Sequence, residues 1–329
     1  MNKTEYKLNS INPVKVLMLG LAPLLLCFSF FMSIFTAFPI GLSSVLYGRK
    51  IGFIVAGISL SSFYLLKNYI FELNDFVLIL FYTISIVLGL SLSEVVKRGI
   101  NPIKGIIFIG VILVSVMSGL VYGIVSEQDK TMKNLIIEKI EEFKPALDEE
   151  RKKIEKSSDK DTFEVQAILA NPNLLADEVI KTVPVLFIMG LFLTLWGNVF
   201  LLLKSNRIFS TSTVPYSEKY LLSFKMPDHA IWFVIGFFAM FLAGDFYLVD
   251  YSLLGTFGKI GLGILGVFYF FQGFGLYLAY LDYFKIYGLF RTMLVVATVL
   301  MANNILAVIG LLDMFVNFKK FMKKNEIGE

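Results

Sequence analysis

The polar side chains that could take part in chemistry are few, and three of them lie in the middle of apolar segments. Gln272 stands in FYFFQGFG, and Asn303 and Asn304 stand together in the last apolar segment. An amide surrounded by hydrocarbon must find a hydrogen-bond partner, on a neighbouring helix or on a bound molecule. We therefore predict that these three amides either join helices or line a binding cavity, and the sequence leaves both roles open.

Three aspartates lie closer to the ends of apolar segments. Asp245 and Asp250 stand at the end of one segment and in its loop, so we place them near the mouth of the predicted cavity. Contact with water or helix capping is the simpler explanation for both. Asp313, in GLLDMFVNFKK, stands near the end of the last segment, where a carboxylate opposes the helix dipole. We expect it to have a cationic partner, for example Lys319.

Two further acidic residues each have a lysine three positions later. Glu94 precedes Lys97, and Asp282 precedes Lys285. Residues three or four apart face each other on a helix. We predict local ion pairs at both places.

No motif for catalysis, metal binding or nucleotide hydrolysis occurs in the sequence. Gly255–Ile260 lacks the spacing and the hydroxyl residue of a phosphate-binding loop, and HExxH, GxSxG and paired-cysteine patterns are missing. Cys27 is the single cysteine and His229 the single histidine. We therefore predict no catalytic residue, no metal and no cofactor. An intramembrane transferase, the least favoured alternative, would need Asp245, Asp250 and Arg291 to converge.

The composition indicates an integral membrane protein. Of the 329 residues, 57% are hydrophobic and only 17% are charged, and the mean hydropathy is +0.74. A water-soluble domain of this size cannot bury that much apolar surface. The composition excludes a soluble enzyme, a disordered chain and a nucleic-acid-binding domain.

Apolar segments of about 20 residues, the length that crosses a bilayer, predict an all-α polytopic transmembrane bundle. The first block, 14–47, is either one tilted helix with a half-helix or two short spans. Seven further spans are expected at 51–71, 76–96, 102–125, 182–203, 229–249, 259–284 and 291–316. The total is eight spans, or nine if the first block is split.

Residues 126–181 differ from the rest of the chain. They contain ten basic and 14 acidic side chains, a net charge of −4, whereas the remaining chain, with 20 and 12, carries +8. An amphipathic pattern over 130–156 and a second helix near 162–170 predict a helical hairpin outside the bilayer. We divide the chain into an N-terminal transmembrane half (1–125), this hairpin (126–181) and a C-terminal transmembrane half (182–329).

Basic residues of the short loops predict the orientation, because they favour the cytoplasmic side. They gather on one side of the predicted spans: Arg49, Lys50, Lys97, Arg98, Lys104, Lys204, Arg207, Lys219, Lys225, Lys285 and Arg291. We predict a multi-pass protein of a bacterial cytoplasmic (inner) membrane. The count places the lysine-rich tail after Lys319 on the opposite side, which its charge disfavours, so the side of the tail stays open.

The C-terminal third resembles a known family through three segments, SFKMPDHAIW, FYFFQGFGLYLAYLDYF and IGLLDMFVNFKK. These are similar to the YybS-like family of bacterial membrane proteins, a domain of unknown function. The resemblance covers residues 220–320. The matching positions are Phe224, Pro227, Asp228, Gln272, Gly273, Gly310, Asp313, Phe318 and Lys319.

That family is distantly similar to the substrate-binding subunits of energy-coupling-factor vitamin transporters. Such subunits bind a small molecule in a helical bundle and use the ATPases of partner chains, so the resemblance implies partner membrane or ATPase subunits. The first apolar block of this chain lacks the paired alanines with which those subunits dock.

Together these observations predict a membrane protein that binds or translocates a small or amphiphilic molecule, without ATPase activity of its own. Its predicted partners are membrane lipid and a small-molecule ligand, and nucleic acid is excluded. The alternative is a non-catalytic scaffold of cell-envelope machinery that acts through the 126–181 hairpin.

Overall fold

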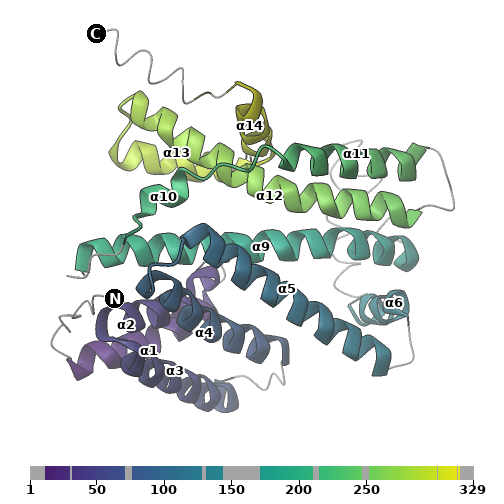
Figure 1. Cartoon of the computed structure of the whole chain (residues 1–329). Coiled ribbons are helices and arrows are strands. Elements are labelled where there is room, and N and C mark those ends of the chain that lie inside the picture. Colours follow the sequence, from purple (N-terminus) through teal and green to yellow (C-terminus); the bar gives the residue numbers. More distant parts are fainter. Residues whose placement is uncertain are drawn as a thin grey trace, which may run out of the picture. The chain divides into compact units, whose positions relative to one another are not determined.

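The described part of the chain is helical in the computed structural model (Figure 1). It comprises residues 12–29, 32–70, 76–127, 131–143, 171–209, 215–246, 252–301, 303–316 and 318, and it contains no strand. The helices are α1 (Pro13–Phe28), η1 (Ser33–Phe35), α2 (Phe38–Tyr47), α3 (Arg49–Ile70), α4 (Phe76–Lys97), α5 (Pro102–Glu127), α6 (Met132–Glu142), α9 (Pro172–Phe209), α10 (Glu218–Leu222), α11 (Ala230–Phe246), α12 (Ser252–Tyr283), α13 (Gly288–Met301) and α14 (Asn303–Val316).

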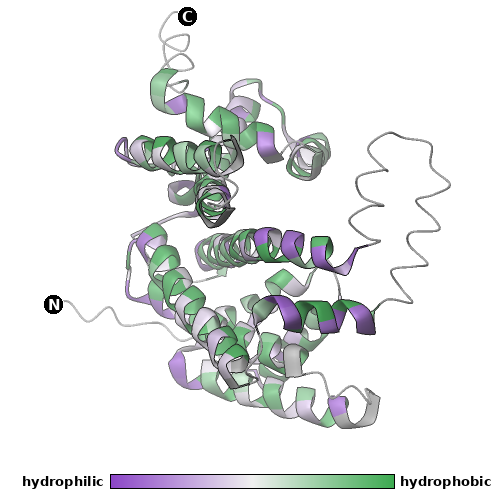
Figure 2. Cartoon of the chain, turned by 90° about the vertical axis from the view of Figure 1, so that its right-hand side faces the viewer, coloured by the Kyte–Doolittle hydropathy of each residue, from purple (hydrophilic) through white to green (hydrophobic). Residues whose placement is uncertain are grey.

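Several of these helices are suited to a membrane. Figure 2 shows hydrophobic residues along most of their length. Large apolar side chains such as Leu25, Phe108 and Leu289 are exposed on their outer faces. Water would penalise such surfaces, whereas lipid does not.

Five described helices (α3, α4, α5, α9 and α12) contain segments long and apolar enough to cross a membrane, and α13 with α14 makes a sixth if this bent pair is one span. The predicted eight or nine spans are therefore not confirmed. The reason is helix length, because α1 has 16 residues and α11 has 17, fewer than the roughly 20 that cross the hydrocarbon. The apolar segments coincide with helices, but in the described part of the chain not every one of these helices is long enough to be counted as a span.

The first apolar block is broken into short helices. The Oδ1 of Asn12 accepts a hydrogen bond from the backbone N–H of Val14 (2.9 Å) and caps α1. The block continues through η1 and the ten-residue α2, which ends at Gly48 with a φ of 91°. This left-handed conformation favours glycine, and it lets the chain turn directly into α3.

The last apolar block is also broken. The predicted single span at 291–316 is the pair α13 and α14, which are bent by 92° at the break between them. Figure 1 shows both helices beside the C-terminal part of α12. The Asn303–Asn304 step therefore lies at the first turn of α14 rather than in the middle of a straight helix.

The helices divide into two compact units. Unit 1 comprises residues 1–111, 190–226 and 267–329, and unit 2 comprises 112–189 and 227–266. The long helices α5, α9 and α12 contribute residues to both. The three domains predicted from the sequence stay a prediction.

The N-terminal part of unit 1 has an apolar core that contains a hydrogen bond between two buried side chains, Tyr82 and Ser59. Helix α2 contacts α3 and α4, and α1 contacts α3. Within this core the rings of Phe63 and Tyr82 stack with centroids 4.1 Å apart. The Tyr82 hydroxyl lies 2.5 Å from the Ser59 Oγ, so the buried phenol keeps a hydrogen-bond partner.

In unit 2, helix α6 begins the segment predicted to be a hairpin. The Nζ of Lys133 on α6 lies 2.7 Å from the Oδ1 of Asp177 on α9, and the Nζ of Lys259 on α12 lies 3.6 Å from the Oε1 of Glu178. The predicted second helix at 162–170 lies outside the described residues. Helix α9 begins at Pro172 and continues without interruption for 38 residues, roughly 57 Å at 1.5 Å per residue.

In unit 1, α12 and α14 approach each other through two glycines. A Cβ atom added at Gly273 would overlap the carbonyl oxygen of Leu306, and one added at Gly310 would overlap the carbonyl oxygen of Tyr269. Small residues allow such close helix contacts within lipid.

Gly273→Ala is expected to push α14 away from α12 and to lower the free energy of unfolding by about 1–3 kcal/mol. The measurement is thermal unfolding in detergent, followed by the loss of the monodisperse peak. Gly266→Ala on the same helix is the matched control, because nothing lies within 4 Å of a Cβ at that position. Equal stability of the two variants would contradict the close contact.

Candidate functional site

One face of α9 changes from apolar to basic along its length. Trp196 and Phe200 are four residues apart, and Lys204 and Arg207 follow at spacings of four and three. These intervals place all four side chains on the same side of a helix. The face therefore has an aromatic part and, at the C-terminal end of the helix, a cationic part.

Helices α12 and α13 show the same change of polarity. Phe271 and Leu278 on α12 are followed by Asp282 at its C-terminal end. On α13, Arg291 stands near the N-terminus and Val295 one turn further on. Because a short turn joins the two helices, their charged ends lie together.

The apolar parts of these faces line a half-open chamber in unit 1 of about 520 Å³. The rings of Trp196 and Phe271 stack in its wall with centroids 4.1 Å apart. The chamber is lined by Ile34, Phe35, Leu193, Trp196, Gly197, Phe200, Lys204, Leu222, Phe270, Phe271, Phe274, Leu278, Arg291, Val295 and Val299. Its volume is within the range of ligand-binding pockets, about 300–1,000 Å³.

The charged ends form a groove of about 710 Å³ that continues the chamber. Both spaces share five lining residues, Phe200, Lys204, Leu222, Leu278 and Arg291. The groove adds Arg207, Glu218, Lys219, Ser223, Gly275, Ala279 and Asp282. The result is one amphipathic site, which we call the α9–α12–α13 site.

Two ion pairs cross this site. The Nη1 of Arg207 lies 2.5 Å from the Oε1 of Glu218, and the Nη1 of Arg291 lies 2.6 Å from the Oδ1 of Asp282. Glu218 is buried, and its other carboxylate oxygen has no hydrogen-bond partner in the described part of the chain. The predicted local partner of Asp282, Lys285, is replaced by Arg291 on the next helix.

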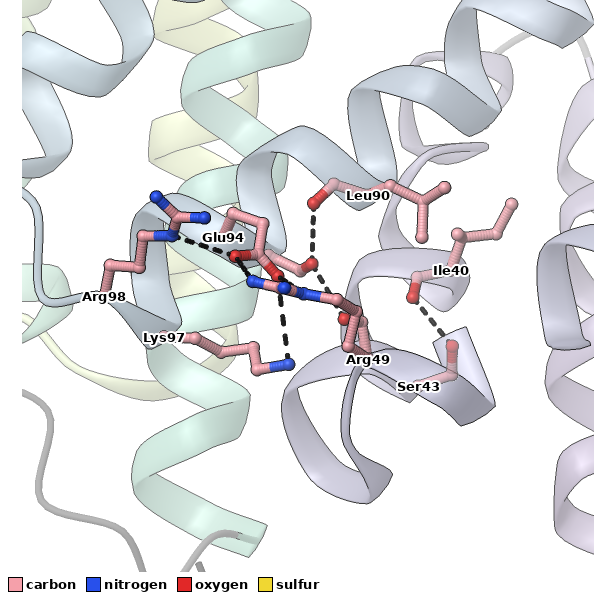
Figure 3. A network of polar contacts seen from close by, with 9 residues as sticks. Ile40, Ser43, Arg49, Leu90, Glu94, Lys97 and Arg98 are labelled. Carbon is pink, nitrogen blue, oxygen red and sulfur yellow. Dashed lines mark hydrogen bonds and ion pairs between the residues drawn. The ribbon is translucent and has the colours of Figure 1, made fainter. Parts of the chain in front are cut away.

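A second polar cluster surrounds Glu94 at the end of α4 (Figure 3). Its carboxylate pairs with Arg98 (3.0 Å) and with Lys97 (4.0 Å), which confirms the predicted local ion pair. It also accepts a hydrogen bond from the Nε of Arg49 (2.9 Å), a residue on α3. Arg49 is 45 positions away, so sequence spacing gave no signal for this contact.

The sequence matches the family described as Predicted membrane protein (DUF2232) over residues 14–314. The chain belongs to the DUF2232 family. Neither the curated proteins nor the solved structures contain a match to this DUF2232 protein. The match supports a membrane protein of unknown function, and it does not confirm the YybS-like name or the similarity to energy-coupling-factor subunits.

Gln272 does not line the α9–α12–α13 site. Its side chain is 2% exposed; the Nε2 donates a hydrogen bond to the Oδ2 of Asp313 (3.1 Å), and the Oε1 accepts one from the backbone N–H of Met226 (2.9 Å). The amide thus joins α12 to α14 and to the segment that follows α10. Its predicted role in binding stays a prediction.

Asp313 is buried in the same hydrogen-bonded group. Besides Gln272, it accepts a hydrogen bond from the backbone N–H of Phe318 at Oδ1 (2.9 Å). Both of these donors are neutral groups rather than the cation expected from the sequence. The proposed cationic partner, Lys319, lies outside the described residues.

The remaining predicted site residues are less well defined. Asn304 is exposed at the first turn of α14, and the side chains of Asn303 and Asp245 lie outside the described set, as does Asp250. Of the residues quoted for the resemblance, Gly273 lies at the α12–α14 contact, whereas Pro227 and Asp228 are exposed before α11. Their predicted part in binding stays a prediction as well.

The residues that line the α9–α12–α13 site were not selected from the sequence. The sequence places Trp196, Phe271 and Lys204 in predicted membrane spans or loops and indicates no functional role for them. The signal that could have found them is the change from aromatic to basic residues at helical spacing on α9. That pattern is common at the ends of membrane helices. It indicates a binding site only when three helix faces of this kind meet in the folded chain.

Gln272→Leu and Asp313→Leu are each expected to lower stability, because each leaves a buried polar partner unsatisfied. In the double variant the loss should be smaller than the sum, with a coupling of about 0.5–3 kcal/mol. The measurement is a double-mutant cycle of unfolding in detergent. Additive effects together with a loss of ligand binding would return Gln272 to the binding role predicted from the sequence.

Proposed function

We propose that this DUF2232 protein binds an amphiphilic molecule in the α9–α12–α13 site, and that this binding serves carriage across or along the membrane without ATPase activity of its own. The observation that carries the proposal is the continuity of the apolar chamber with the charged groove. A wholly apolar ligand would leave the groove unfilled, and a wholly polar one would leave the chamber unfilled. A molecule with both parts matches the site.

The chamber offers a hydrocarbon tail a dense aromatic and aliphatic surface. Trp196 and Phe271 stack along one wall, and Val295 and Val299 contribute branched side chains from α13. The transfer of apolar ligand surface out of water contributes roughly 25 cal/mol per Å². A tail that is already in the lipid bilayer gains less free energy on entering the chamber, because it is already out of water. The charged groove must therefore supply much of the preference of the ligand for this site over the surrounding lipid.

The groove includes basic residues that the distribution of loop charges predicts to lie on the cytoplasmic side. Lys204, Arg207, Lys219 and Arg291 all belong to that set. We propose that the site opens toward the cytoplasmic face of a bacterial inner membrane. Head groups at that interface can then reach the groove while the tails stay in the hydrocarbon.

The test uses the two tryptophans of the chain, Trp196 and Trp232. Trp196 is 5% exposed in the chamber wall, and Trp232 is 70% exposed. In a Trp232→Phe background, brominated lysophospholipids, with either a glycerol or a choline head group, are titrated into the purified protein. Saturable quenching of Trp196 is expected for at least one of them.

A matched pair of substitutions separates the chamber from the lipid-facing surface. Val295→Phe fills the chamber and is expected to weaken the saturable quenching about tenfold or more, because the tail loses its space. Val296→Phe adds the same volume one residue further on, at a side chain 51% exposed and outside the lining, and should change little. Quenching that rises without saturation, or equal effects of the two variants, would contradict the proposal.

A further inference from the structure

We propose that the amphiphile is anionic and carries a phosphate that binds between Lys204 and Arg291; this inference rests on the proposed function and names its ligand class. These two cations are the charged residues that line both the chamber and the groove. They therefore mark the point where the head group of a molecule with its tail in the chamber must lie. The charged side chains nearest to such a head group are therefore the two cations, Lys204 and Arg291.

The charge of the groove favours an anion. Its lining contains four basic residues, Lys204, Arg207, Lys219 and Arg291, against the acidic Glu218 and Asp282. The two ion pairs account for both carboxylates and for both arginines. In the described part of the chain, Lys204 and Lys219 have no ion pair, so the groove retains a formal charge of +2. A phosphate group can balance it.

The ion pair of Arg291 leaves it able to bind a second anion. Arg291 contacts Asp282 through Nη1. A guanidinium has five N–H donors in a planar fork, so further donors of Arg291 remain for a second anion. Arg291 lines both the chamber and the groove, and its side chain is less exposed than that of Asp282. Phosphate oxygens are well suited to such a fork.

An anionic head group is also favoured by its location. Lys204, Arg207 and Lys219 are exposed at the ends of otherwise apolar helices, where a charge-assisted hydrogen bond to an anion can stabilise them. A choline head group would add a positive charge near Lys219 and cancel part of the attraction. A free phosphate would satisfy the cations but would leave the chamber empty.

The experiment compares three probes on the full-length chain in the Trp232→Phe background. Brominated lysophosphatidylglycerol, which is anionic, is expected to quench Trp196 with an affinity about tenfold or more above that of brominated lysophosphatidylcholine at about 0.1 M salt. Inorganic phosphate at millimolar concentration should not displace either lipid. Loss of the preference at high salt is expected, because the contribution of the groove is electrostatic.

Lys204→Gln together with Lys219→Gln should remove most of the preference for the anionic lipid. The affinity of the anionic lipid should fall about tenfold, and that of the choline lipid should fall less, because the choline charge already offsets its phosphate. When position 204 of that double variant carries arginine instead of glutamine, part of the preference for the anionic lipid should return. Lys104→Gln on α5 is the control, since this exposed lysine does not line the site. Equal affinities of the two lipids, or displacement by free phosphate, would overturn the inference while the cavity proposal stands. Saturable quenching by neither lipid would overturn both.

Discussion

The contact between α12 and α14 determines which face of α12 is left for the α9–α12–α13 site. The two helices meet through Gly273 and Gly310, at a distance that leaves no room for a Cβ atom. Gln272, beside the first glycine, spans the contact and donates to the buried carboxylate of Asp313. With this side of α12 occupied by α14, the aromatic residues on its other side are available to line the chamber.

The arrangement also explains why a strongly polar group is tolerated in an apolar region. An unpaired amide or carboxylate in hydrocarbon costs several kcal/mol, and here each satisfies the other. The backbone N–H groups of Met226 and Phe318 complete the set. Since these partners come from separate segments, the hydrogen bonds specify one packing of the C-terminal part of unit 1.

The α9–α12–α13 site and the Glu94 cluster share a physical principle. In each, basic residues exceed acidic ones, and the acidic residues are held in ion pairs between helices. Residual positive charge therefore collects at the ends of helices whose remaining length is apolar. Such a distribution attracts anionic groups to the interface, and at the α9–α12–α13 site an apolar chamber lies directly behind the charge.

Hydropathy and charge along the chain were enough to establish an all-helical membrane protein, to locate most of the long apolar helices and to predict the ion pair of Glu94 with Lys97. These properties depend on the composition of short segments, which act independently of distant residues. The lengths of the first and last helices, the pairing of Arg291 with Asp282 and the bond between Gln272 and Asp313 could not be obtained in that way. They depend on residues far apart in the chain that meet only when helix faces pack. The sequence around an amide in an apolar segment also does not indicate whether its side chain contacts another helix or a ligand.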